Sequence, residues 1–214
     1  MANVNVAFGL RPVGVVGSAP NSTGTTEYRI SSSNTNAIYQ GAPVIPLNTG
    51  FIDRVGAASG GTVGLLGVFW GCTYVSSVTG KTVWSNYWPG SGANSSFPVT
   101  AFVYDNPLQT FVIATSNLNT SWDTEAELRA AVFANANFAG AQSGSTVTGI
   151  SSATLDVQTI DTTNTLQLRI IGIQQDPENS DFTAAGIPVL VRLNNHFNAP
   201  NGSIAAGTVS TTGV

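Results

Sequence analysis

The most apolar stretch of the chain, residues 63–75, is interrupted by glycine. It reads VGLLGVFWGCTYV, with three glycines in thirteen residues. Each interior glycine costs a helix about 1 kcal/mol relative to alanine, whereas a strand uses glycine to bend or to approach another backbone closely. The stretch is also shorter than the ~18 apolar residues that a membrane-spanning helix needs. It therefore predicts a buried, bent β-strand and no membrane span.

Charge is scarce throughout the sequence. Only 8% of the residues are charged, against roughly a quarter in an ordinary soluble domain. A helical bundle or coiled coil needs many charged helix formers, and this chain has a single lysine, Lys81. Hydrophobic residues still make up 42% of the chain, which excludes disorder through low hydrophobicity. The composition is that of a β-rich, turn-dense globular protein.

The charge balance and the cysteine count limit the partners. The net charge is −4 and the six arginines are scattered from Arg11 to Arg192, so we expect no nucleic-acid binding. Cys72 is the only cysteine, which excludes an intramolecular disulfide and a cysteine metal cluster. Residues 1–5 have neither the basic nor the apolar part of a secretory signal. We therefore expect synthesis in a reducing cytoplasm.

Short strand patterns separated by turn signals recur along the chain. They predict a β-sandwich, jelly roll or barrel of about ten short antiparallel strands. Thr79-Gly80-Lys81 predicts a hairpin turn after the apolar stretch. Asp105-Asn106-Pro107 predicts a second hairpin, which joins strands at 98–104 and 109–114.

One segment has helical rather than strand character. Thr124 and Glu127 have the spacing of a capping box, Glu125 and Arg129 are four residues apart, and Leu128 begins an apolar face. We predict one short helix near 123–134.

The chain divides by composition into three parts. Residues 1–25 form an extended N-terminal arm, residues 26–197 a β domain, and residues 198–214 a polar C-terminal tail. Two small β domains fit the same length. The arm contains an apolar island at 7–13, and it is either frayed or docked onto a partner surface.

Two residues are the obvious candidates for nucleophilic or acid–base catalysis. His196 is the only histidine, and it follows a predicted strand without a nucleophile elbow around any serine. We interpret it as a hydrogen-bonded histidine at the rim of the fold. Cys72 lies within the most apolar strand with no basic neighbour in sequence, so we interpret it as a small buried hydrophobe.

Residues 176–181 (DPENSD) place three carboxylates and an amide in one loop. Oxygen ligands of this kind suit a hard cation, but the spacing matches no defined calcium loop, and a solvated turn is the simpler interpretation. No local pattern selects two of the eleven acidic residues for glycoside hydrolysis. We predict a protein that is not an enzyme and that uses no cofactor and no metal.

Trp84, Tyr87 and Trp88 form the one notable aromatic cluster. Strand alternation predicts that Trp84 and Trp88 share one face while Tyr87 points the other way. Such side chains pack in a core, anchor a protein interface or stack on a sugar. A carbohydrate- or receptor-binding module that uses Trp84 and Trp88 is therefore an alternative function.

Five segments resemble a group of tailed-bacteriophage virion proteins, the capsid decoration or cement proteins. They are AFGLRPV at 7–13, AIYQGAPV at 37–44, LGVFWGCTY at 66–74, SNYWP at 85–89 and VRLNNH at 191–196. The resembling segments are spread over most of the chain, and their motifs are structural rather than catalytic. Ala42 stands where this resemblance leads us to expect an acidic residue.

The resemblance implies a β-sandwich or barrel protein on the outer surface of a phage capsid. It implies a homotrimer that bridges neighbouring subunits of the major capsid protein. An apolar N-terminal arm suits docking onto a neighbour, and a cement protein needs contact area rather than a reaction centre. The residues that we expect at capsid or subunit interfaces are Phe8, Leu10, Arg11, Trp84, Tyr87 and Trp88.

Overall fold

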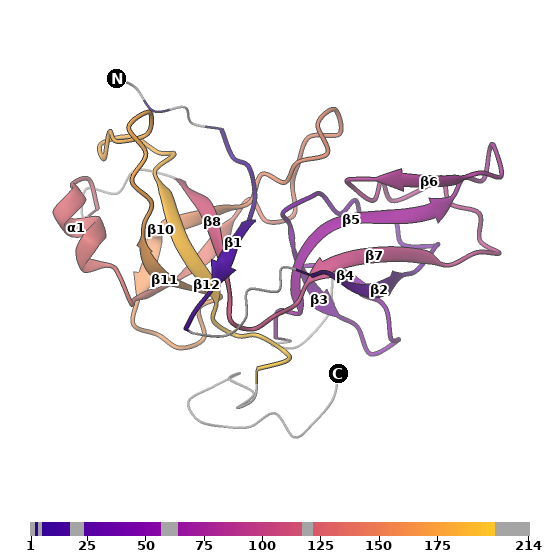
Figure 1. The fold of residues 1–214 in the computed structure, drawn as a ribbon, viewed down its shortest axis with the longest axis horizontal. Coiled ribbons are helices and arrows are strands. Elements are labelled where there is room, and N and C mark those ends of the chain that lie inside the picture. Colours follow the sequence, from indigo (N-terminus) through magenta and orange to yellow (C-terminus); the bar gives the residue numbers. More distant parts are fainter. Residues whose placement is uncertain (1–2, 4–5, 18–23, 57–63, 117–121, 200–214) are drawn as a thin grey trace.

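The computed structural model describes residue 3 and residues 6–17, 24–56, 64–116 and 122–199. These residues form twelve strands and one six-residue helix, which confirms the predicted all-β fold with a single short helix. The strands form two sheets, which lie beside each other as two lobes, and each has its own buried apolar cluster (Figure 1).

Five strands of the first sheet close into a barrel. In spatial order they are β8 (Gln109–Ser116), β10 (Thr154–Asp161), β9 (Asn135–Ala139), β11 (Leu168–Ile173) and β12 (Pro188–Leu193), and β12 pairs back with β8. Adjacent strands are antiparallel except β10 and β8. Alternation along β8 directs Phe111 and Ile113 into the core, as expected of strands with one buried face.

The second sheet is antiparallel throughout. Its order is β2 (Thr26–Ile30), β7 (Val99–Tyr104), β5 (Gly67–Val75), β3 (Pro43–Pro46) and β4 (Ile52–Arg54), and β6 (Thr82–Ser85) pairs with the far half of β5. The glycine-rich apolar stretch supplies β5, whose pairing with β7 is irregular between Phe69 and Gly71. At Gly67 a Cβ atom would lie 2.2 Å from the Tyr104 carbonyl oxygen. The predicted bent, closely packed strand is confirmed.

One predicted hairpin is wrong. β7 belongs to the second sheet and β8 to the barrel, so residues 105–108 carry the chain from one lobe to the other. The turn signal at Asp105-Asn106-Pro107 is real, but a turn does not specify that its two strands pair with each other. The hairpin at Thr79-Gly80-Lys81 does form, because β5 and β6 pair across it and Gly80 has a φ of 68°.

The helix α1 (Glu125–Ala130) is shorter than the predicted 123–134. Its capping box is present, since the Thr124 hydroxyl accepts from the Glu127 backbone N–H and the Glu127 carboxylate accepts from that of Thr124. Glu125 and Arg129 form an ion pair. Phe133 ends the helical path with a φ of 78° and donates its backbone N–H to the Ile170 carbonyl at 2.9 Å, so the chain turns into β9.

Much of the predicted N-terminal arm packs on the chain itself. β1 (Arg11–Val15) pairs antiparallel with β8, which also pairs with β10. Just before β1, a Cβ at Gly9 would lie 2.8 Å from the Gly41 carbonyl oxygen, and both glycines have positive φ. Only glycine fits this close crossing. Residues 1–2, 4–5 and 18–23 of the arm, and 200–214 of the predicted tail, lie outside the described residues.

The five segments that carry the family resemblance meet where the lobes join. Gly41 accepts from the Leu10 backbone N–H at 2.9 Å and donates to the Phe69 carbonyl at 2.8 Å. Ile38 and Trp88 exchange backbone hydrogen bonds. The segment 191–196 reaches the same region through a bridge between His196 and Leu65, the residue just before 66–74.

A loop of the barrel lobe also reaches the second lobe. Residues 140–153, which connect β9 to β10, run across to the other lobe in Figure 1. Gln40 pairs with Ile150, and the Asn86 side chain donates to the Thr148 carbonyl at 2.8 Å. We call residues 140–153 the clasp loop. Among the described residues, no helix is long and apolar enough to cross a membrane.

Candidate interaction surfaces

Two of the six predicted interface residues have fully buried side chains. Leu10 is 0% exposed in the barrel core, and Trp88 is 0% exposed in the core of the second sheet. The Trp88 indole donates to the Asn34 carbonyl at 3.2 Å and packs edge-on against Tyr74. Neither side chain is available to a partner of the folded chain, so both are corrected to core residues.

The prediction that Trp84 and Trp88 share one face is also wrong. β6 ends at Ser85, whose hydroxyl donates to the Tyr87 carbonyl at 2.7 Å and accepts from the Tyr87 backbone N–H. This local turn interrupts the alternation, because a side chain–backbone hydrogen bond competes with the sheet ladder. Trp84 is 60% exposed while Trp88 is buried. The paired aromatic platform required by the carbohydrate-binding alternative is absent.

Tyr87 stabilises the junction of the lobes. Its ring stacks on Tyr39, with centroids 5.7 Å apart and planes 9° from parallel. Gly144 of the clasp loop lies against the Tyr39 ring, where a Cβ would be 2.3 Å from Cγ. Tyr87 is half-buried, and its stack on Tyr39 is a contact within the chain.

Phe8 and Arg11 lie beside the acidic loop, a proximity that the sequence did not indicate. The Arg11 guanidinium sits over the Phe8 ring, 4.5 Å from its centroid. Both residues line an open groove of about 340 Å³ that Asp176 and Glu178 also line. The one ion pair in the described part of the chain joins Glu125 and Arg129, so the charges at this groove remain available to a partner.

The acidic loop has the local structure of a solvated turn. The Asp176 carboxylate accepts from the Glu178 backbone N–H and the Asn179 amide. The Asp181 carboxylate accepts from the backbone and hydroxyl of Thr183, and these hydrogen bonds lower the pKa of Asp181. Across the described residues, no three His, Cys, Asp or Glu side chains are placed to hold a metal ion.

His196 and Cys72 are both buried. His196 is 1% exposed rather than at the rim, and its Nδ1 accepts from the Asn198 backbone N–H at 3.1 Å. Burial lowers the pKa of His196 to about 4 and raises the pKa of Cys72 to about 12. At neutral pH the imidazole is therefore uncharged and the thiol protonated, as expected of a small buried hydrophobe at Cys72.

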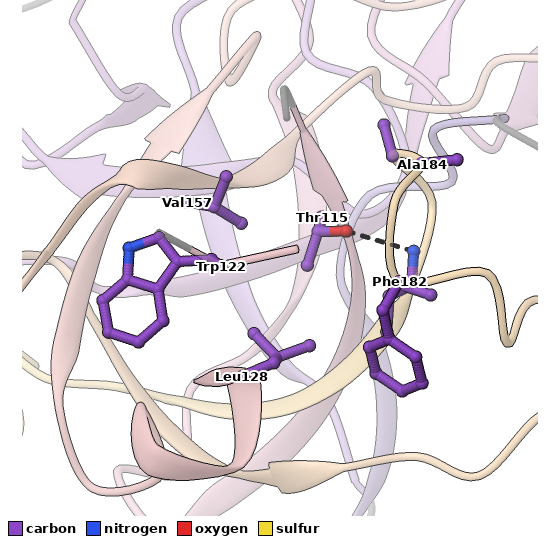
Figure 2. A pocket seen from close by; sticks show the side chains of 8 residues that line it. Thr115, Trp122, Leu128, Val157, Phe182 and Ala184 are labelled. Atoms are coloured by element: carbon purple, nitrogen blue, oxygen red, sulfur yellow. Dashed lines mark hydrogen bonds between the residues drawn. The ribbon is translucent and has the colours of Figure 1, made fainter. Parts of the chain in front are cut away.

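A small pocket lies between α1 and the barrel (Figure 2). Leu128, Val157 and Phe182 give it an apolar lining, and the Thr115 hydroxyl at its edge accepts from the Ile187 backbone N–H at 3.0 Å. Its free volume of about 10 Å³ holds about one water molecule. The pocket is a packing defect beneath the helix and too small for a substrate.

The exposed face of the second sheet is the surface that sequence reasoning missed. Paired strands align Arg29, Thr100, Thr73 and Trp84 in one row across four strands. The next row contains Glu27, Phe102 and Gly71. Alternation within residues 26–30 and 99–104 was the available signal, but the rows follow only from the pairing register.

Comparison with known proteins found no matching family model, no matching curated protein and no matching solved structure.

Proposed function

We propose that the chain is a structural virion protein that decorates the outside of a phage head and cements neighbouring subunits of the major capsid protein. The observation that carries this proposal is the meeting of the five resembling segments at the junction of the lobes. Residues 7–13, 66–74 and 85–89 each contact residues 37–44 there through backbone hydrogen bonds or close glycine contacts. His196 bridges to Leu65, the residue just before 66–74. The resemblance therefore concerns the framework of the fold rather than composition alone.

The groove at Phe8 and Arg11 is the proposed capsid-facing surface. It combines the exposed guanidinium of Arg11 with the carboxylates of Asp176 and Glu178 and with the apolar ring of Phe8. Interfaces of moderate affinity have this mixture of an apolar centre and a polar rim. The acidic net charge suits an outer position better than contact with packaged DNA. Copies at three-fold positions would then bind the lattice multivalently.

Cryo-electron microscopy of the virion tests the assignment. We expect density for this fold on the outer surface of the head, in contact with the major capsid protein. Density only in the tail or inside the head would refute it.

Attachment of the purified protein to heads that lack it tests the groove. Arg11→Glu should reduce occupancy about tenfold, because it removes an interfacial charge pair and introduces repulsion. Lys81→Glu is the matched control: it makes the same charge change at the distant β5–β6 hairpin, and it should leave attachment unchanged. Equal occupancy for both variants would rule out the groove as the attachment surface.

A further inference from the structure

The two rows on the second sheet form one outward surface, which we call the outer face. The residues that alternate with them, including Ile30, Cys72, Val99 and Ala101, belong to the buried cluster of this lobe. The row members therefore point to solvent, since successive side chains of a strand point to opposite faces. The outer face contains Glu27, Arg29, Gly71, Thr73, Trp84, Thr100 and Phe102.

The Trp84 ring packs against the outer face at Gly71. A Cβ atom at Gly71 would be 3.2 Å from the indole Cζ2 and 3.6 Å from Cε2, so the ring covers the bare backbone of Gly71. Its other side is open, and the residue is 60% exposed. Arg29 lies at the other end of the same row, three strands away. Tryptophan and arginine are the residue types that contribute most binding energy at protein interfaces.

The charges on the face are two residues apart on β2. Glu27 and Arg29 are both exposed, and neither is in an ion pair among the described residues. The Arg29 Nη1 donates to the Thr100 hydroxyl at 2.7 Å. This hydrogen bond holds the guanidinium on the outer face and restricts its freedom before any partner arrives.

We propose that the outer face binds the same face of a second copy of this chain. A two-fold axis that runs across the strands, between the two rows, places Arg29 opposite Glu27 of the second copy. The reciprocal pair forms at the same time, because a two-fold interface repeats every contact. The same operation sets Thr73 opposite Gly71 of the second copy, where it faces the Trp84 ring that covers this glycine. Both charges of the face are therefore matched in one arrangement.

A sugar is the competing occupant of a face with an open tryptophan. A neutral sugar would stack on Trp84 but would leave one anion and one cation of the face without a partner of opposite charge. A second copy satisfies both charges, and this complementarity favours it. The inference does not depend on the phage assignment.

The size of the face sets the expected affinity. Four strands about 4.8 Å apart and two rows about 7 Å apart make a surface of roughly 15–20 Å by 10 Å. This area is much smaller than the ~800 Å² per partner of a standard interface. We therefore expect a dissociation constant of roughly 10 µM to 1 mM. Such a contact is useful where many copies are held side by side, because tethering multiplies weak contacts.

Sedimentation equilibrium of the purified chain, at concentrations up to about 2 mM, tests the proposal. Arg29→Glu and Glu27→Arg should each raise the dimer dissociation constant at least about tenfold, because each single change opposes like charges. The double variant Glu27→Arg/Arg29→Glu restores opposite pairs and should return to within about threefold of the wild type. Arg129→Glu makes the same charge change on α1 of the barrel lobe and should change nothing. Circular dichroism verifies the fold of each variant.

Three outcomes would overturn the proposal. The wild type could stay monomeric throughout the concentration range. The single variants could associate as tightly as the wild type, which would assign association to another surface. The double variant could fail to recover. A monomeric protein whose Trp84 fluorescence responds to an oligosaccharide would assign the face to a sugar instead.

Discussion

At the scale of single residues, His196 is the side chain whose position departs most from expectation. A histidine just past a strand, among asparagines, has the sequence context of a surface loop. The structure buries it because residues 194–197 continue alongside Leu65, which donates to the Asn195 carbonyl and accepts from the Phe197 backbone N–H, both at 2.7 Å. His196 Nε2 is buried without a hydrogen-bond partner among the described residues. The folded protein therefore disfavours the charged imidazole.

This burial predicts a specific pH dependence of stability. The pKa of His196 falls from 6.5 to about 4 on folding, so the unfolded chain binds the proton more tightly. The stabilisation is complete above pH 6.5 and is lost as the pH falls toward 4, by about 2–3 kcal/mol near pH 4.5. Urea unfolding at pH 7 and pH 4.5 measures it.

His196→Asn is the comparison variant, because its side-chain oxygen can still accept a hydrogen bond and it does not titrate. It should lose less stability than the wild type between the two pH values, by that same 2–3 kcal/mol. An identical loss in both proteins would contradict the prediction.

At the scale of elements, signals from neighbouring residues predicted the helix cap, a turn and a bent strand. They did not predict which strands pair with each other. The capping box at Thr124 and Glu127, the turn at Gly80 and the glycine-bent strand β5 were all predictable, because each depends on neighbours in sequence. The partner of β7 was not predictable, since nothing local distinguishes a hairpin from a crossing between lobes. The positions of Trp84 and Trp88 failed because a serine turn interrupts the strand between them.

The same capping box provides a test at this scale. Thr124→Ala removes the hydroxyl that accepts from the Glu127 backbone N–H at 3.3 Å and should lower the free energy of unfolding by about 1 kcal/mol. Thr124→Ser retains the hydroxyl acceptor and should lower the free energy of unfolding by only about 0.3 kcal/mol. Chemical denaturation measures both. If alanine costs no more than serine, the packing of Leu128 alone holds the helix in place.

At the scale of the whole molecule, two cores are held together by short backbone contacts and by the clasp loop. The length of the chain was compatible with two small β domains, but composition and strand spacing did not indicate where the chain divides, because both lobes use the same residue types. Three of the six predicted interface residues, Leu10, Tyr87 and Trp88, stabilise the chain internally, which leaves Phe8, Arg11 and Trp84 on the surface.

A substitution in the clasp loop should weaken the coupling between the two lobes. Gly144→Ala would place a Cβ 2.3 Å from Tyr39 Cγ and should cost about 1–3 kcal/mol through overpacking. Gly24→Ala, with no atom within 4 Å of the new Cβ, should change stability by less than about 0.5 kcal/mol. Denaturation measures both variants. Limited proteolysis should then cleave Gly144→Ala faster at residues 105–108, and unchanged cleavage would show that the clasp does not control the crossing.

The order of the strands has a consequence for synthesis on the ribosome. The second sheet is built from residues 26–104, a continuous piece of chain, whereas the barrel needs β1 from the beginning and β8 to β12 from the end. The second lobe can therefore assemble while translation continues. β1 must wait for its partner β8, and Leu10 must wait for the later strands that complete the barrel core, so their apolar surface stays uncovered during this part of synthesis. That interval is when the nascent protein is most exposed to aggregation and most dependent on chaperones.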